Sequence, residues 1–471
     1  MKQEKIQDAL NYIDETMIEE VDTLRNAKPE IALKRGFHRN KTSGKTGVVS
    51  KIAKHWYKYV AVAAVLCVVV VSIANRPVTV EAVDLMKGIE PQKVETVGNL
   101  KESCAEVTDF GIRLFQATMK EGENTLLSPL SVISALAMTA NGADGETLAQ
   151  MEEVLGLNTE ELNGYMYTYM SQLPKSETCQ LQLANSIWFT DAETFRVEKD
   201  FLQINADYYG ADIYQRKFDR RAVDEINLWV SLKTEEMIPE ILDEIPEEAV
   251  MYLVNALAFE AEWLSIYKEH QVREGIFTME DGTQRNVELM YSDEYSYLED
   301  ELATGFLKYY KGGKYAFVAL LPKEGVSVAE YVASLSGENL QNMFGKATEE
   351  KVYTAIPKFE MEYNIELSQV LADMGMINAF DVDMADFSKL GQDTRPGWNI
   401  YISRVLHKTY IQVGEQGTKA GAATVVEMER GGSSGPVEEP KEVILDRPFV
   451  YMLVDAENKL PFFIGTLMDV E

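Results

Sequence analysis

The chain has 471 residues, of which 46% are hydrophobic and 10% aromatic, so it can bury a large core and is not disordered over most of its length. This length accommodates one large mixed domain together with a tail. The formal net charge of -31 argues against nucleic acid as a partner, because no folded basic face is left to neutralise phosphates.

Residues 1–58 are predicted to form a cytoplasmic leader that is basic in its second half. Apolar residues recur at helical spacing from Ile6 to Leu24, which indicates an amphipathic helix there. The run from Tyr59 to Ala74 that follows is apolar without interruption. This run predicts a transmembrane segment over residues 59–76.

The charges around the apolar run predict its orientation. Many lysines and arginines precede it and only Arg76 directly follows it, which places the amino terminus in the cytoplasm by the positive-inside rule. We therefore expect a single-pass cell-membrane protein with an extracellular C-terminal domain. The alternative is secretion after cleavage near Ala74, because Ser72-Ile-Ala74 is typical of a signal-peptidase site.

Residues 77–98 are predicted to be a linker and residues 99–471 a domain of the α+β class. Helical and strand patterns are interspersed in this domain, whereas a parallel doubly wound sheet would alternate them regularly. The predicted helices lie near 109–119, 131–140 and 222–237, and the predicted strands at 181–189, 315–321, 351–359 and 449–455.

Cysteine is too rare for a disulfide framework. Cys67 lies in the apolar run, so only Cys104 and Cys179 remain for the domain, and whether these two pair is left open. No pair has the close spacing of a zinc site. We expect neither a metal nor a cofactor.

Short motifs follow one another along the domain. The first is Asn124-Thr-Leu-Leu-Ser128-Pro-Leu-Ser131, and the last is Arg447-Pro-Phe449 with Pro461-Phe-Phe-Ile-Gly465. Each motif alone is weak, but the ordered set resembles the serpin family of protease inhibitors. The resemblance implies a serpin fold with central mixed β-sheets, surrounding helices and an exposed reactive-centre loop. Between the ends lie Gly142-Ala-Asp-Gly145, Ile226-Asn-Leu-Trp229, Val254-Asn255-Ala256, Ile356-Pro-Lys-Phe359 and Met374-Gly-Met376.

One segment is similar to the hinge of the reactive loop in inhibitory serpins. A loop that becomes a strand inside an existing sheet needs small residues at alternate positions, because those side chains are buried there. Gly417 supplies backbone freedom for the turn into the sheet, and no charged residue or proline occupies the alternate positions from Thr418 to Val426. The hinge residues so assigned are Glu415, Gly417, Thr418, Ala420, Ala422, Ala423 and Thr424.

The cleaved bond is predicted between Arg430 and Gly431. The usual spacing of the family places cleavage next to Gly431, and an arginine beside it suits the acidic pocket of a trypsin-like serine protease. The neighbouring residues 427–429 leave elastase-like and cysteine proteases as alternative targets. The loop between the hinge and Pro448 is about six residues longer than is typical for the family.

The resemblance implies a suicide-substrate mechanism and a switch. The protease forms an acyl-enzyme with the loop, and the freed hinge then inserts as a new strand and distorts the protease. The resemblance also implies a sheet-opening switch, and the matching residues are Ser128, Ser131, Asn255 and His407. We expect a monomeric, extracellular inhibitor, and a bacterial surface protein by analogy.

The sequence also bears on three other functions. A hydrolase is disfavoured, because only His270 and His407 remain as general bases in the domain and no Gly-x-Ser-x-Gly motif is present. A non-inhibitory serpin-fold binding protein stays an alternative, although the small-residue hinge argues against it. A transmembrane sensor, in which the amphipathic leader reports on the outer domain, is the other alternative.

Overall fold

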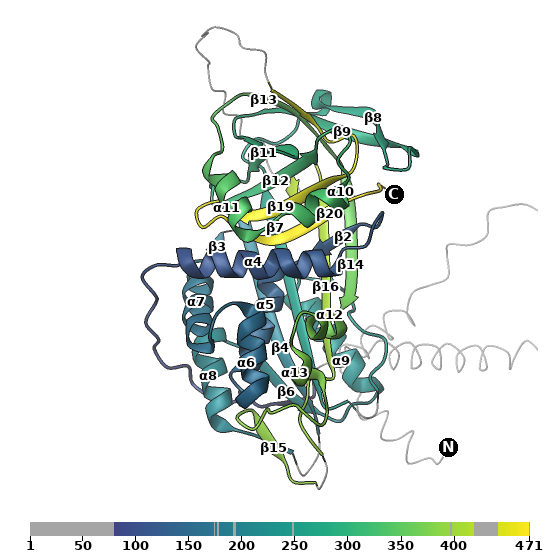
Figure 1. Ribbon diagram of the computed structural model, residues 1–471. Coiled ribbons are helices and arrows are strands. Elements are labelled where there is room, and N and C mark those ends of the chain that lie inside the picture. Colours follow the sequence, from purple (N-terminus) through teal and green to yellow (C-terminus); the bar gives the residue numbers. More distant parts are fainter. Residues whose placement is uncertain are drawn as a thin grey trace, which may run out of the picture. The chain divides into compact units, whose positions relative to one another are not determined.

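A large eight-stranded sheet runs along the domain in the computed structural model, which describes residues 80–173, 175–176, 179–191, 195–246, 249–395, 398–418 and 441–470 (Figure 1). The strand order is β1-β6-β4-β7-β17-β16-β14, and β3 pairs with β4 beside this path. Its strands are β1 (Val83–Asp84), β3 (Lys175–Ser176), β4 (Cys179–Thr190), β6 (Asp212–Arg216), β7 (Met251–Glu262), β14 (Phe359–Glu366), β16 (Arg404–Val413) and β17 (Gly417–Thr418).

Three smaller sheets complete the described strands. The six-stranded sheet has the order β10-β11-β12-β19-β20-β2, the four-stranded sheet β18-β13-β9-β8, and β15 pairs with β5. Their bounds are β2 (Thr125–Leu127), β10 (Tyr297–Glu299), β11 (Ala303–Tyr309), β12 (Tyr315–Pro322), β19 (Phe449–Asp455), β20 (Leu460–Leu467), β8 (Val272–Thr278), β9 (Gln284–Glu294), β13 (Val352–Pro357), β18 (Lys441–Ile444), β5 (Phe195–Val197) and β15 (Gly391–Asp393).

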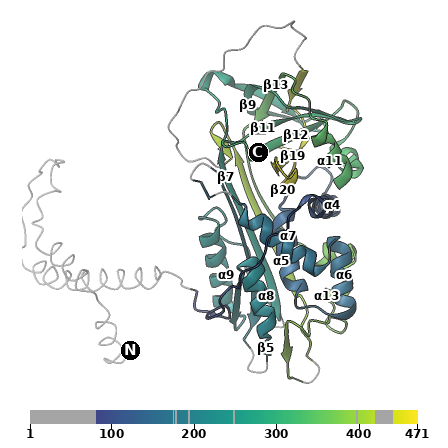
Figure 2. The same ribbon diagram turned by 90° about the vertical axis from the view of Figure 1, so that its left-hand side faces the viewer.

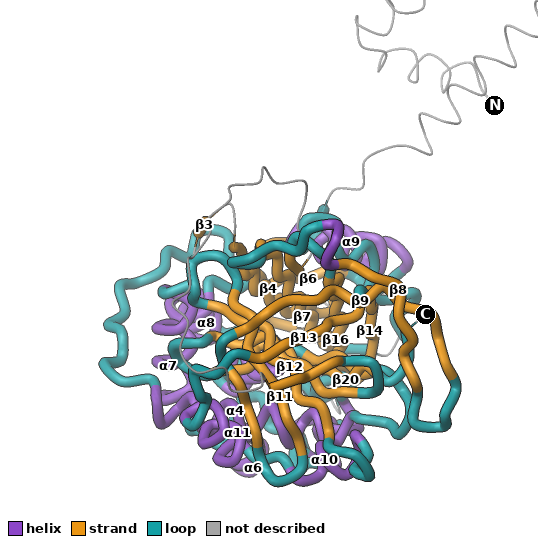
Figure 3. The backbone as a smooth tube through the Cα atoms, turned by 90° about the horizontal axis from the view of Figure 1, so that it is seen from above, coloured by secondary structure: helices purple, strands orange, loops and turns teal. Residues whose placement is uncertain are grey.

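Helices cover both faces of the large sheet. Figure 2 shows α9 on one face and α5 and α6 on the other, and Figure 3 shows α9 and α6 on opposite sides of the sheet from above. The mixture of sheets and helices confirms the predicted α+β class. The helices are α4 (Lys101–Thr118), α5 (Pro129–Ala140), α6 (Gly145–Leu155), α7 (Thr159–Ser171), α8 (Lys199–Tyr209), α9 (Arg220–Lys233), α10 (Val328–Ser334), α11 (Gly337–Gly345), α12 (Ser368–Asp373) and α13 (Ile377–Phe380), with a 3-10 turn η1 (Glu269–Gln271).

Strand β7 is buried on both faces because it lies between two hydrophobic cores. Successive side chains of a strand point to opposite faces of the sheet. Leu253, Leu257 and Phe259 therefore belong to the larger core, which the helices α4 to α8 share. Tyr252 and Val254 belong to the smaller core under α9. The parity of a residue in this part of the sheet thus decides which core it meets.

Helix α5 is positioned by the cap at its start. The Ser128 hydroxyl oxygen accepts a hydrogen bond from the Ser131 backbone N–H at 3.3 Å, and Pro129 occupies the first helical turn. A serine cap and a proline directly after it are favourable at a helix start, because they satisfy or remove donors that have no helical partner. The cap places both serines beside the middle of the large sheet.

Several predicted elements have different bounds in the structure. The strand predicted at 351–359 is two strands, β13 and β14, which are separated at Lys358 and belong to different sheets. Helix α9 ends at Lys233 rather than near residue 237, because Glu235 and Glu236 have φ angles of 50° and 63°, which an α-helix does not contain. Strand β19 has the predicted bounds.

Residues 80–98, which are part of the predicted linker, lie against the domain. Strand β1 pairs with the edge strand β6, and the Ala82 N–H donates to the Glu225 carboxylate on α9 at 2.9 Å. The Gln92 N–H donates to Asp207 on α8 at 2.7 Å. This segment therefore extends the large sheet by one short strand.

The localisation predicted from the sequence is wrong. Within the ranges that the structure describes, no helix combines the length and the apolar character needed to cross a membrane. The longest of them, α4, has 18 residues and buries one face against the sheets while charged residues lie on its other face. The predicted segment 59–76 and the leader before it lie outside the described residues.

The two cysteines of the domain are buried and are not bonded to each other. Burial raises the pKa of each thiol, Cys104 and Cys179, to about 11, because a thiolate is poorly solvated there. Both therefore stay protonated at neutral pH and act as small apolar side chains.

Candidate functional site

The candidate site is the seam between strands β7 and β16, and its two ends differ. In the lower half the two strands pair directly in parallel, from Arg404 opposite Tyr252 to Lys408 opposite Ala256. At the upper end, β17 lies between them and pairs antiparallel with both. The seam is therefore closed at its foot and already holds a short third strand at its top.

The hinge residue Gly417 passes unusually close to β7. A Cβ atom at this position would lie 2.0 Å from the Ala261 carbonyl oxygen, far inside any allowed contact. Gly417 also has a φ of 157°, which side chains disfavour. Only glycine fits here, so the predicted requirement for glycine has a second cause, close approach, which the sequence did not indicate.

Thr418 is the first residue of the chain that fills the seam with a side chain. It pairs with Ala261 on β7 and with Val413 on β16, and it is 1% exposed. Its hydroxyl shares a hydrogen bond with the hydroxyl of Tyr310, which follows β11. The Thr418 side chain, at the start of the predicted hinge, is therefore buried on the face of the sheet that meets the larger core.

The turn before the hinge is fixed by backbone hydrogen bonds to the top of the seam. Trp263 donates its backbone N–H to the Gln416 carbonyl at 2.8 Å and its indole N–H to the Gly414 carbonyl at 2.9 Å. The Trp263 ring also stacks on Tyr310, with the centroids 4.4 Å apart. The same two aromatic residues therefore hold both the turn and Thr418.

Glu415 forms an ion pair with Lys358, the residue between β13 and β14. Lys358 also pairs with Glu288 on β9 at 3.0 Å. Burial opposes the charged forms, but the mutual pairing prevails: it raises the pKa of Lys358 and lowers the pKa of Glu415. The pair ties the turn to the neighbouring four-stranded sheet, and both groups are charged at neutral pH.

The four residues of the predicted sheet-opening switch lie together at the middle of the seam. His407 on β16 pairs across it with Asn255 on β7, at 2.6 Å between Nδ1 and Oδ1. The Ser128 N–H donates to His407 Nε2 at 3.0 Å, and the Ser131 hydroxyl donates to Asn255 Oδ1 at 3.0 Å. All four side chains are fully buried. Parting the strands breaks the His407–Asn255 contact.

The protonation of His407 follows from these contacts. Burial lowers the pKa of the imidazole to about 3, so the ring is neutral at physiological pH. Because Nε2 accepts from Ser128, the single ring proton is on Nδ1 and is donated to Asn255. The Asn255 Nδ2 group has no hydrogen-bond partner among the described residues.

Two groups at the top of the seam were missed by the sequence analysis. Lys308 on β11 is buried, and its ammonium contacts Glu294 at 2.7 Å and lies 4.4 Å from the Tyr267 ring centroid. A lysine inside an otherwise apolar strand was the only signal. Lys358 was quoted only as part of the motif that ends at Phe359, because its partner Glu415 is distant in the sequence.

The remaining predicted site residues lie outside the described part of the chain. They are Ala420, Ala422, Ala423, Thr424, Arg430 and Gly431.

Comparisons with known proteins agree with this architecture. The family model described as serpin (serine protease inhibitor) matches residues 105–470. Human Serpin B9 is 31% identical over 374 residues, which is 76% of this chain and 96% of that protein. A serpin-like protein of Thermococcus kodakarensis is 30% identical over 406 residues, which is 84% of this chain and 92% of its own length.

A solved structure gives the same result for the fold. The crystal structure of the thermophilic serpin tengpin in the native state superposes with a TM-score of 0.79 and 46% identity, and the match covers 83% of this chain and all of that one. The predicted serpin fold is therefore confirmed. The chain belongs to the serpin family, whose members in general are protease inhibitors rather than enzymes.

Proposed function

We propose that this protein is a suicide-substrate inhibitor of serine proteases, with trypsin-like enzymes favoured and elastase-like or cysteine proteases as further targets. The observation that carries the proposal is the seam, which holds β17 at its top and is closed below by direct β7–β16 pairing. A strand that continues β17 can insert between β7 and β16. We assign the activity to a monomer and to the domain predicted over residues 99–471.

The proposed chemistry is an interrupted acyl transfer. The protease serine Oγ attacks the Arg430 carbonyl carbon, the bond to Gly431 breaks, and the proton passes to the new amino group of Gly431. Hydrolysis of the resulting ester needs the protease's intact oxyanion hole. Insertion of the loop pulls the ester and the attached protease along the seam before water completes the reaction.

The length of the hinge segment fits this translocation. Arg430 lies twelve positions after Thr418, which is about 40 Å of extended strand at roughly 3.3 Å per residue. On β7, Met251 lies ten positions before Ala261. An inserted strand in the register of β17 therefore extends along the whole seam and places Arg430 just beyond its lower end, at the start of β7.

The composition of the loop fits burial in this seam. Continued from Thr418, the even-numbered positions meet the larger core, and they are Ala420, Ala422, Thr424 and Val426. Small or apolar side chains there avoid the cost of burying an unpaired polar group. The odd-numbered positions, which include Lys419 and Glu427, face the α9 side.

The test is to incubate the full chain with trypsin, and separately with an elastase-like protease, and to analyse the products on denaturing gels. We expect an ester-linked complex near the sum of the two masses and a released fragment that begins at Gly431. A protease whose catalytic serine is replaced by alanine should give no such band. Cleavage after Arg430 without any complex, for every protease tried, would contradict the inhibitory proposal.

A further inference from the structure

A buried ion pair lies where three sheets meet at the top of the seam. Lys308 comes from β11 of the six-stranded sheet and Glu294 from β9 of the four-stranded sheet, and Nζ and Oε1 are 2.7 Å apart. Only 2% of the lysine side chain and 14% of the glutamate side chain are exposed. The large sheet contributes the segment directly after β7, which brings Trp263 and Tyr267 to the lysine.

The ammonium of Lys308 lies over two aromatic rings. It is 4.4 Å from the ring centroid of Tyr267 and 5.4 Å from that of Trp263. The attraction between a cation and a ring face is strongest where water is excluded. Burial disfavours the charged lysine, but Tyr267 and Glu294 outweigh this cost and raise the pKa of Lys308. The lysine is therefore charged at neutral pH and is attracted to both rings.

The same two aromatic residues hold the turn that precedes the hinge. Trp263 donates two hydrogen bonds to this turn, at 2.8 and 2.9 Å, and the Tyr267 backbone N–H donates to the Glu415 carbonyl at 3.0 Å. The three consecutive carbonyls of residues 414–416 therefore accept from two residues whose rings lie beside Lys308. The ion pair is connected to the turn through these two residues.

Stability alone does not account for a buried ion pair. The desolvation of two charges offsets much of their attraction, and neutral side chains of similar size are often as stable or more stable at such positions. The pair instead fixes a geometry, because the ammonium must keep contact with its carboxylate and with both rings. The carboxylate is fixed in turn, since the Ser292 hydroxyl donates to Glu294 Oε1 at 2.7 Å.

We propose that Lys308 and Glu294 are positioning residues for loop insertion, which hold the 263–267 segment and, through it, the turn at 414–416. The proposal rests on the proposed function. Insertion competes with hydrolysis of the ester, and an inserted strand must continue the register in which Thr418 pairs with β7. A turn that is fixed in advance lets this pairing start at once, whereas a turn that moves delays it. Without the ion pair, more of the loop is hydrolysed before it inserts.

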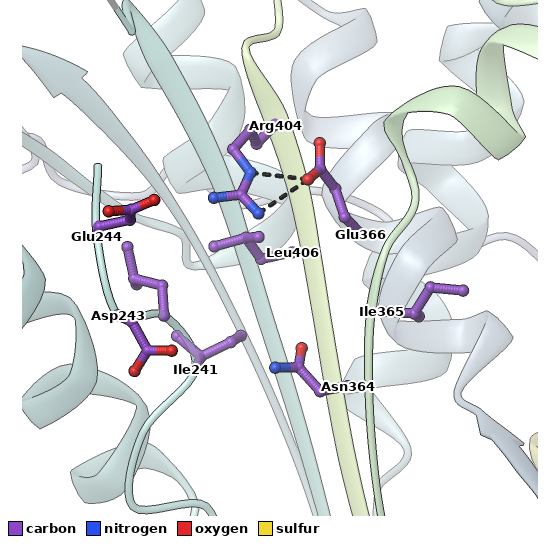
Figure 4. A pocket seen from close by; sticks show the side chains of 9 residues that line it. Ile241, Asp243, Glu244, Asn364, Ile365, Glu366, Arg404 and Leu406 are labelled. Atoms are coloured by element: carbon purple, nitrogen blue, oxygen red, sulfur yellow. Dashed lines mark hydrogen bonds and ion pairs between the residues drawn. The ribbon is translucent and has the colours of Figure 1, made fainter. Parts of the chain in front are cut away.

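An ion pair at the foot of the seam lacks these connections and provides a control. Figure 4 shows Arg404 on β16 bonded to Glu366 on β14, and the closest nitrogen and oxygen are 2.8 Å apart. The two side chains are 29% and 41% exposed, and both strands lie on the same side of the seam. Glu366→Gln therefore breaks an ion pair without reaching the turn or a contact across the seam.

The test compares stability and trapping of trypsin by variants of the full chain. Lys308→Met leaves the Glu294 charge without its partner and should lower stability. Lys308→Met combined with Glu294→Gln gives neutral side chains of similar size and should recover most of the loss. We expect both variants to trap less. The number of inhibitor molecules consumed per protease molecule inactivated should rise about threefold or more, while the rate of loop cleavage stays unchanged.

A second measurement needs no protease. The backbone N–H groups of Trp263 and Tyr267 donate to the turn, so both amides should exchange with solvent about fivefold faster in the neutral double variant than in the natural chain. Amides of the central strand β19 should exchange at an unchanged rate. Unchanged exchange at Trp263 and Tyr267 would contradict the positioning role.

A further control separates positioning from stability. Arg216→Met breaks the buried pair of Arg216 with Glu225, which lies at the edge of the large sheet on β6 and α9. This variant and Glu366→Gln should consume no more inhibitor than the natural chain, even where Arg216→Met lowers stability as much as Lys308→Met. A neutral double variant that traps as efficiently as the natural chain, or trapping that follows stability in every variant, overturns this inference alone. A natural chain that traps no protease overturns the proposed function and this inference with it.

Discussion

Different interactions hold the strands together at the top and at the middle of the seam. At the top, a two-residue strand is already in place, and it is fixed by Thr418, by the turn hydrogen bonds of Trp263 and by the half-exposed pair of Glu415 with Lys358. At the middle, a fully buried neutral network joins β7 directly to β16 through His407 and Asn255. If the loop inserts as proposed, its entry begins at the top of the seam and the buried network resists its progress.

The largest effect is expected from a charge at the first buried position of the hinge. In Thr418→Arg, a guanidinium would have to enter the larger core, where it has no partner, at a cost of several kcal/mol. We expect the loop to be cleaved without forming a covalent complex, a loss of at least a hundredfold in trapped protease on denaturing gels. Lys419→Arg is the control and should trap normally, because the next residue of an inserted strand would face the opposite side of the sheet. Normal trapping by Thr418→Arg would contradict the account of the top of the seam.

The network at the middle predicts a pH dependence. The pKa of His407 is lowered from 6.5 to about 3, so the unfolded chain takes up a proton below pH 6.5 that the folded protein does not take up until about pH 3. Stability should therefore fall as the pH drops through this window, by about 3 kcal/mol at pH 4 from this group alone, and this group should have no effect above pH 6.5.

Two measurements check this dependence. Unfolding titrations from pH 7 to pH 4 should show a smaller slope for His407→Gln than for the natural chain. The imidazole resonances of His407 should stay at their neutral positions down to about pH 4.5. An imidazole that titrates near pH 6.5 in the folded protein would show that the network is not closed as described.

A smaller effect is expected where the hinge passes β7. Gly417→Ala places a Cβ atom against the Ala261 carbonyl, so the hinge must move out of the seam at a cost of about 1–3 kcal/mol. We expect lower stability, a changed tryptophan fluorescence from Trp263 and slower trapping. Gly414→Ala is the matched control, because no atom lies within 4 Å of its added Cβ. If Gly417→Ala and Gly414→Ala have the same stability and trapping rate, the placement of β17 between β7 and β16 is contradicted.

The smallest effect is expected for the ion pair at the turn. Glu415→Gln removes the contact to Lys358, and because the pair is partly exposed the loss should stay below about 1 kcal/mol. Glu288→Gln removes the other partner of Lys358 but leaves the turn attached. Thermal unfolding should therefore respond more to Glu415→Gln, and increasing salt should reduce the difference. A larger response to Glu288→Gln would contradict the role given to Glu415.

The sequence analysis predicted elements well where the pattern was local. Strand β19 has the predicted bounds, and α5 ends at the predicted Ala140, although it begins two residues before the predicted start, directly after its serine cap. The division of 351–359 into two strands was missed because it depends on Lys358, whose partners are distant in the sequence. Strand β1 was missed because two exposed residues on an edge strand carry no pattern of their own.

The site could be predicted in part because its composition is constrained. Of the alternating residues that predicted a buried strand, Thr418 is described and buried, whereas the switch residues, which were assigned from the resemblance, meet where the start of α5 contacts β7 and β16. The close approach of Gly417 to Ala261 and the burial of Lys308 could not be predicted, because both depend on which strands lie side by side. The apolar run at residues 59–76 predicted a membrane protein, and this localisation was wrong.

The most direct test of insertion is a crystal structure of the full chain after cleavage between Arg430 and Gly431. We predict a continuous strand from Gly417 to residue 428 between β7 and β16, antiparallel to β7, with the His407–Asn255 contact broken. A cleaved protein in which Arg404 still pairs directly with Tyr252 would contradict the account.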